Sequence, residues 1–104
     1  MDEKYIINPP RKVNGRRDYV SIMRSKLSEF DKKKILSYMK AFNEPCGCCP
    51  GYIYDPVQKK ELDELENQFT DGKYIWYSSW LYYFEKYDLR LNPDFIQHVF
   101  EQTR

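Results

Sequence analysis

Three cysteines lie close together in the sequence, as Cys46, Cys48 and Cys49, and their thiols are the side chains best suited to chemistry. A structural zinc site takes four ligands, usually from two separated pairs. The chain offers no second cysteine pair, and His98 is its only histidine, so a Cys3His site requires His98 to fold back onto the cysteine loop. A disulfide from Cys46 to Cys48 or Cys49 is a further alternative. We expect reduced cysteines in a turn bounded by glycine and proline, and no metal or cofactor.

Catalysis by one of these thiols needs a base within hydrogen-bond reach and a third group that orients the base. Nothing in the sequence brings His98 near Cys46. The acidic residues of 61–66 follow two lysines at helical spacings, which is typical of a solvated helix face and not of a catalytic carboxylate pair. Phosphate-binding loops, dinucleotide fingerprints and H-E-x-x-H motifs are absent from the sequence. We therefore expect no enzymatic activity.

Charge is divided unevenly along the chain although the net charge is only +1. Residues 1–52 hold eleven Lys or Arg against six Asp or Glu, and residues 53–104 hold six against ten. This division predicts either complementary surfaces on one globule or a basic face that meets an acidic partner. A nucleic-acid binder is the less favoured alternative, because the aromatics that would stack on bases lie in the acidic half. Its phosphate contacts would come from Arg11, Lys12, Arg16, Arg17, Arg24, Lys26 and Lys32 to Lys34.

Eight of the fourteen residues from Tyr74 to Tyr87 are aromatic, and this aromatic block is the dominant feature of the sequence. One small core is not expected to absorb so many rings, and exposed rings of this kind mark interaction sites. We expect Trp80, Phe84 and Tyr87 in the core. The other rings predict an exposed patch that binds another protein, with a basic segment as its electrostatic guide. The predicted contact residues are Trp76, Tyr77, Tyr82 and Tyr83, together with Arg11, Arg16 and Arg17.

The elements that would position these residues follow from hydrophobic spacing and from turn residues. Residues 5–7 predict a short edge strand, which the prolines at 9 and 10 end. Residues 1–15 are expected to be loosely ordered, and residues 11–17 form a basic turn. A first helix is expected from Asp18, with a strand over Tyr19–Met23 as the alternative. The apolar face of that helix is Tyr19, Met23, Leu27 and Phe30.

A second helix is expected after Ser28 or Asp31, either of which is able to cap it. Its apolar stripe is Ile35, Leu36, Met39 and Phe42. Residues 43–51 form the cysteine loop, and residues 52–54 predict a short strand. Asp55-Pro56 carries the cap and the first-turn proline of a helix start, so a third helix is expected to run to Asp71-Gly72. Its apolar face is Leu62, Leu65 and Phe69.

Residues 74–77 predict a strand, residues 80–87 a helix capped by Ser78 or Ser79, and Asn92-Pro93 the start of a last helix. The chain is thus predicted to be α+β, a predominantly helical small single domain of residues 1–104 with two or three short strands. No apolar run approaches the roughly 20 residues that span a bilayer. The N-terminus lacks the basic and apolar segments of a secretory signal. A cytoplasmic location is therefore expected, without membrane contact.

The segment from Trp80 to Ile96 joins an aromatic helix, a short link and a capped final helix. In this pattern it resembles the C-terminal part of small bacterial immunity proteins, which neutralise toxins. The resemblance implies a cytosolic inhibitor that binds a toxin domain in a one-to-one complex. We therefore expect a small protein-binding module. A zinc- or thiol-dependent domain built on the loop from Cys46 to Cys49 is the alternative from another class.

Overall fold

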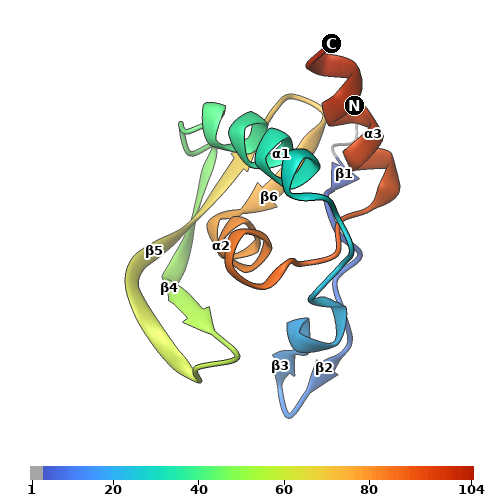
Figure 1. The fold of residues 1–104 in the computed structure, drawn as a ribbon. Coiled ribbons are helices and arrows are strands. Elements are labelled where there is room, and N and C mark those ends of the chain that lie inside the picture. The colour runs from blue at the N-terminus through green and yellow to red at the C-terminus, as the bar shows by residue number, and fades with distance from the viewer. Residues whose placement is uncertain (1–3) are drawn as a thin grey trace.

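The strands form a mixed four-stranded sheet and a separate small hairpin (Figure 1). The computed structural model describes residues 4–104, with the backbone alone for residues 48–50. The sheet has the order β1-β6-β5-β4, where β1 runs parallel to β6 and the other neighbours are antiparallel. Its strands are β1 (Lys4–Tyr5), β4 (Gly47–Asp55), β5 (Lys60–Thr70) and β6 (Tyr74–Tyr77). The hairpin pairs β2 (Lys12–Val13) with β3 (Arg16–Arg17).

Within residues 4–104, three α-helices accompany the sheet: α1 (Glu29–Ala41), α2 (Ser78–Tyr87) and α3 (Pro93–Gln102). Helices make up 38% of the residues that the structure describes and strands 28%, so the fold is a small α+β domain. The prediction of a predominantly helical chain is therefore wrong. None of the helices in the described residues has the length and apolar character that a bilayer crossing requires.

The core lies where the helices meet β6. This strand has hydrogen-bonded neighbours on both sides, and Tyr74, Ile75 and Trp76 are all buried. Of the three predicted core residues of the aromatic block, Trp80 and Phe84 are buried and Tyr87 is half-buried. The aromatic block is therefore mainly a packing element, because β6 and α2 present it to the interior from two directions.

Residues 60–70 form a strand and not the predicted third helix. Asp55 does act as a cap, since its Oδ1 accepts the N–H of Val57 at 2.9 Å and of Gln58 at 2.8 Å. Lys59 then takes a left-handed conformation, with φ of 56°, which ends the turn and directs the chain into β5. Pairing with β4 on one edge and β6 on the other satisfies the β5 backbone. These non-local hydrogen bonds outweigh the local helix signal.

The predicted first helix is wrong beyond its first turn. Only Tyr19–Ile22 is helical, as a 3-10 turn, and the strand alternative over the same residues is wrong as well. The backbone N–H of Arg24 donates to the carbonyl of Tyr87, and that of Ser25 to Asp88, each at 2.9 Å. These bonds to the end of α2 take the place of helical bonds in this segment, and Arg24 has a left-handed φ of 69°.

The second predicted helix is confirmed as α1. Ser28 caps it, with its Oγ accepting the N–H of Asp31 at 3.1 Å. Lysine in a first helical turn is unfavourable, and here Lys32 forms an ion pair with Asp88 at 2.7 Å. Phe30, expected on the apolar face of the first helix, lies on α1 with 75% of its surface exposed.

Candidate functional site

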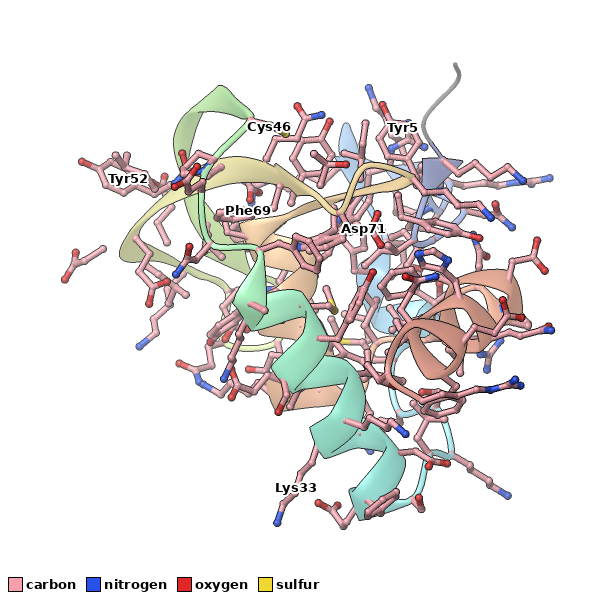
Figure 2. All side chains as sticks on the ribbon, turned by 90° about the horizontal axis from the view of Figure 1, so that it is seen from above. Tyr5, Lys33, Cys46, Tyr52, Phe69 and Asp71 are labelled. Carbon is pink, nitrogen blue, oxygen red and sulfur yellow. The ribbon has the colours of Figure 1, made fainter. Side chains whose placement is uncertain are left out.

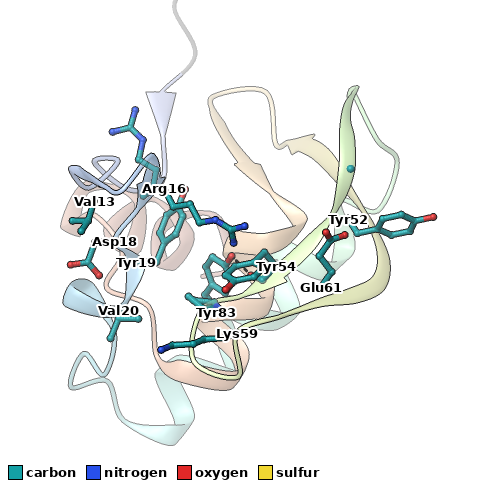
Figure 3. A pocket seen from close by; sticks show the side chains of 13 residues that line it. Val13, Arg16, Asp18, Tyr19, Val20, Tyr52, Tyr54, Lys59, Glu61 and Tyr83 are labelled. Carbon is teal, nitrogen blue, oxygen red and sulfur yellow. Dashed lines mark hydrogen bonds between the residues drawn. The ribbon is translucent and has the colours of Figure 1, made fainter.

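A cleft of about 650 Å³ opens between the β2–β3 hairpin and the β4–β5 hairpin (Figure 3). We call it the hairpin cleft. Residues 13–20 form one wall, residues 51–61 form the other, and α2 contributes Tyr83. The volume lies within the roughly 300–1,000 Å³ that is usual for ligand sites. The lining residues that matter below are Arg16, Tyr19, Tyr52, Tyr54, Lys59 and Tyr83.

The inner surface of the hairpin cleft is built from stacked and hydrogen-bonded rings. The guanidinium carbon of Arg16 lies 4.1 Å from the centre of the Tyr54 ring, a cation–π contact that joins the two hairpins. Tyr83 donates its hydroxyl to the carbonyl of Tyr54 at 2.5 Å. Tyr19 packs beside Tyr83 with ring centres 5.0 Å apart, and its hydroxyl accepts the Trp80 indole N–H at 3.0 Å. The lining is therefore preorganised by the core.

A two-residue turn brings Arg16 to this position. Asn14 and Gly15 both have positive φ, at 54° and 82°, as the tight turns of β-hairpins require. Val13 and Arg16 are then direct partners across the hairpin. Arg17 is fixed beside them, because its guanidinium donates to the carbonyl of Pro10 at 2.6 Å.

The outer rim of the hairpin cleft is apolar and exposed. Tyr52 has 52% of its surface accessible, and Val13 and Val20 are also exposed. Figure 2 shows the Tyr52 side chain projecting away from the sheet, and in Figure 3 the same side chain points outward, away from Tyr54. In β4, Tyr52 is exposed and Tyr54 is half-buried, and Ile53 between them is buried. The pairing of β4 with β5 is irregular between Tyr52 and Tyr54, so the two rings leave the strand in different directions (Figure 3).

The β4–β5 hairpin is tied to α2 by the buried carboxylate of Asp55. Its Oδ2 accepts the hydroxyls of Tyr82 at 2.6 Å and Tyr87 at 2.7 Å. Burial raises the pKa of Asp55, but these hydrogen bonds and those from the turn backbone outweigh burial and lower it to about 2. Burial and the bond to Asp55 raise the pKa of Tyr82 to about 12. The carboxylate is therefore charged at neutral pH, and its role is to hold the hairpin.

A second buried carboxylate, Asp71, caps the β5–β6 turn in a similar way. Its Oδ1 accepts two backbone N–H groups, and its Oδ2 is shared by the Tyr38 hydroxyl at 2.6 Å and by His98 Nε2 at 3.0 Å. Burial raises the pKa of Asp71, and these hydrogen bonds outweigh burial and lower it. A carboxylate, an imidazole and a phenol are catalytic residue types. These three side chains do not line the hairpin cleft, and their polar atoms join α1, the turn and α3.

The predicted contact residues of the aromatic block are less accessible than expected. Trp76 is 0% exposed and Tyr83 is buried, because both belong to the core; Trp76 offers no surface to a partner, and Tyr83 contributes only to the inner lining of the hairpin cleft. Tyr77 is half-buried against Trp80, with ring centres 4.8 Å apart, and Tyr82 is half-buried with its hydroxyl on Asp55. The expectation of an exposed Trp/Tyr patch here is wrong for Trp76 and Tyr83.

The predicted basic guide is exposed on and beside the β2–β3 hairpin. Arg16 and Arg17 line the hairpin cleft, whereas Arg11 does not. The structure therefore places part of the predicted charge beside rings, but these are the rings of β4 and of Tyr19, and not those of the aromatic block.

Residues 47–51 of the cysteine loop form the first part of β4, and Cys46 lies just before the strand. Cys46 is exposed, and the side chains of Cys48 and Cys49 lie outside the described residues. His98, their proposed fourth ligand, is hydrogen-bonded to Asp71 and near Tyr38. In the described part of the chain, no group of three or more His, Cys, Asp or Glu side chains is placed to hold a metal ion.

Sequence reasoning missed Tyr19, Tyr52, Tyr54 and Lys59 as site residues. The signal for the β4 pair was present, because Tyr52-Ile53-Tyr54 alternates as a half-buried strand does. Lys59 was assigned to a helix that does not form, so its position at the cleft had no sequence signal. No known protein-family profile, curated protein or solved structure matches this chain.

Proposed function

We propose that the chain is a small cytosolic protein-binding module that receives its partner in the hairpin cleft, and that it acts as an inhibitor of the immunity type. The observation that carries this proposal is the composition of the cleft. The cleft is lined by an exposed tyrosine, Tyr52, and by an arginine, Arg16, held over a second tyrosine, Tyr54. Tyrosine and arginine are the residues most enriched among those that dominate binding energy at interfaces.

The preorganised lining also supports binding. Because Tyr54, Tyr83 and Tyr19 are fixed by hydrogen bonds and ring contacts, little side-chain entropy remains to be lost when a partner docks. The inhibitor role comes from the resemblance of residues 80–96 to immunity proteins. The helix of that segment, α2, supplies Tyr83 to the cleft.

The other two function classes have less support. A zinc site would need His98, whose Nε2 is engaged by Asp71 at 3.0 Å. A nucleic-acid site would place phosphates beside Asp18 and Glu61, which line the same cleft and repel them.

The experiment is affinity capture from cells that express the chain naturally, with the tagged full chain as bait. We expect a protein bound in equimolar amount by the wild-type chain, and at least about tenfold less of it with Tyr52→Ala. Phe30→Ala is the matched control, because it also removes an exposed aromatic ring but lies on α1, outside the cleft. Equal capture by both variants, or no equimolar protein, would reject the hairpin cleft as the binding site.

A further inference from the structure

Three cations line the hairpin cleft: Arg17, which is engaged by the carbonyl of Pro10, and two that come from opposite walls, Arg16 and Lys59. Arg16 reaches in from the β2–β3 hairpin and Lys59 from the β4–β5 turn (Figure 3). The ion pairs among the described residues use Lys32, Lys40, Lys86 and His98, so neither Arg16 nor Lys59 has a carboxylate partner there. Cations on two walls of one cleft that lack carboxylate partners attract an anionic group that enters the cleft.

We propose that the hairpin cleft binds an acidic segment of the partner's polypeptide, with carboxylates that pair with Arg16 and with Lys59. The inference rests on the proposed binding function and names the chemistry of the partner. Arg16 is suited to the role because a guanidinium pairs with a carboxylate through two parallel hydrogen bonds. Its position 4.1 Å over the Tyr54 ring holds the guanidinium in place before the partner arrives.

The surroundings favour a polypeptide over a small carboxylate. Val13, Val20 and Tyr52 extend exposed apolar surface beyond the two cations, and a free metabolite would leave that surface uncovered. They also favour a polypeptide over nucleic acid. Asp18 and Glu61 line the two walls of the same cleft, where a continuous phosphate backbone would meet them (Figure 3). A peptide carries charge only at chosen positions and is able to place neutral or basic residues there.

The experiment uses phage-displayed random linear peptides selected on the full-length chain. We expect the enriched peptides to carry net negative charge and at least one large apolar residue. The most enriched sequence is then synthesised, and its affinity is measured by fluorescence anisotropy at low and at physiological salt. We expect binding to weaken as salt rises, because exposed charge pairs are screened.

Substitutions then test which cations of the cleft bind the peptide. We expect Arg16→Ala and Lys59→Asn each to weaken binding of the acidic peptide about tenfold. Asparagine suits position 59 because it tolerates the left-handed φ of 56°. Arg11→Ala is the matched control, an exposed arginine outside the cleft, and we expect less than about a twofold change. The charge-reversed pair Arg16→Glu with Lys59→Glu should reject the acidic peptide and accept its lysine counterpart, which general loss of packing would not produce.

Several results would overturn the inference. Enriched peptides without negative charge would do so, as would no enrichment, or equal binding to the Arg16→Ala and wild-type chains. Tighter binding of a single-stranded oligonucleotide of the same charge would assign the cleft to nucleic acid. Self-association in sedimentation that Arg16→Glu abolishes would assign it to a second copy. Capture that depends on Tyr52 while the peptides lack negative charge would leave the binding function standing and remove only the acidic partner.

Discussion

On α2, the hydroxyls of Tyr82, Tyr83 and Tyr87 all end on acceptors of the β4–β5 hairpin, whereas Tyr52 of that same hairpin is 52% exposed. We call the first set the α2 tyrosines. Their acceptors are buried or half-buried, so each hydroxyl must keep its bond for the fold to be stable. The fold does not depend on Tyr52 in this way. Substitutions in the α2 tyrosines and their acceptor should therefore change the free energy of unfolding, and substitution of Tyr52 should change binding.

The largest effect is expected at Asp55, the acceptor that two α2 tyrosines share. Asp55→Ala leaves two tyrosine hydroxyls and two backbone N–H groups without their partner, and we expect a loss of about 3 kcal/mol in the free energy of unfolding. Urea unfolding followed by circular dichroism measures it. Glu64→Ala, an exposed acid on the same hairpin, is the control and should change stability by less than about 0.5 kcal/mol. A loss at Asp55 no larger than the control's would remove the distinction between the two regions.

Acid should break the same contacts without a substitution. The pKa of Asp55 is about 2 in the folded chain, below its ordinary 3.8, so the folded state favours the charged form. The resulting stability is fully present above about pH 4 and is lost as the pH falls through 2, about 2 kcal/mol in all. Asp71, whose pKa is also lowered, adds to the loss in the same direction. Urea unfolding at a series of pH values measures the slope, and Asp55→Asn should be less steep than the wild type. Identical slopes would contradict the role given to this carboxylate.

A smaller effect is expected from removing a single hydroxyl. Tyr87→Phe keeps the ring and deletes one hydrogen bond to Asp55, so we expect a loss of about 1 to 2 kcal/mol. Tyr52→Phe is the matched control, and the exposed position predicts no measurable change in stability. Equal thermal midpoints for the two variants would show that the Tyr87 bond contributes nothing.

The same comparison explains which elements the sequence could predict. The helices α1 and α3 and the strand β6 carry their own caps or their own apolar patterns, so local signals were sufficient. Residues 18–30 and 56–69 also show helical spacing, but their backbones bond to distant parts of the chain. The backbone N–H of Arg24 donates to the carbonyl of Tyr87, and β5 pairs with two strands. Such non-local bonds have no signature in a sequence window.

The candidate site was less predictable than the fold because it depends on those non-local contacts. Arg16 was predicted as a guide for the aromatic block, and folding places it over Tyr54 instead. The density of aromatics from 74 to 87 indicates many rings but not which of them are buried. The α2 tyrosines lie where their hydroxyls reach two acceptors, the Asp55 carboxylate and the Tyr54 carbonyl. The sequence does not show which tyrosine bonds to which acceptor, because β4 and α2 come together only in the folded chain.

The smallest effect on stability, and the sharpest contrast with Asp55, is expected for Tyr52→Ala. The side chain is 52% exposed and lies on an edge strand, so we expect the free energy of unfolding to change by less than about 1 kcal/mol. The same substitution should weaken binding of the captured partner at least about tenfold, because an exposed tyrosine of the cleft supplies interface contact area. Urea unfolding and titration with the partner give the two values on one sample. A variant that loses several kcal/mol would show that Tyr52 belongs with the α2 tyrosines. A variant that keeps both stability and affinity would show that the ring belongs to neither region.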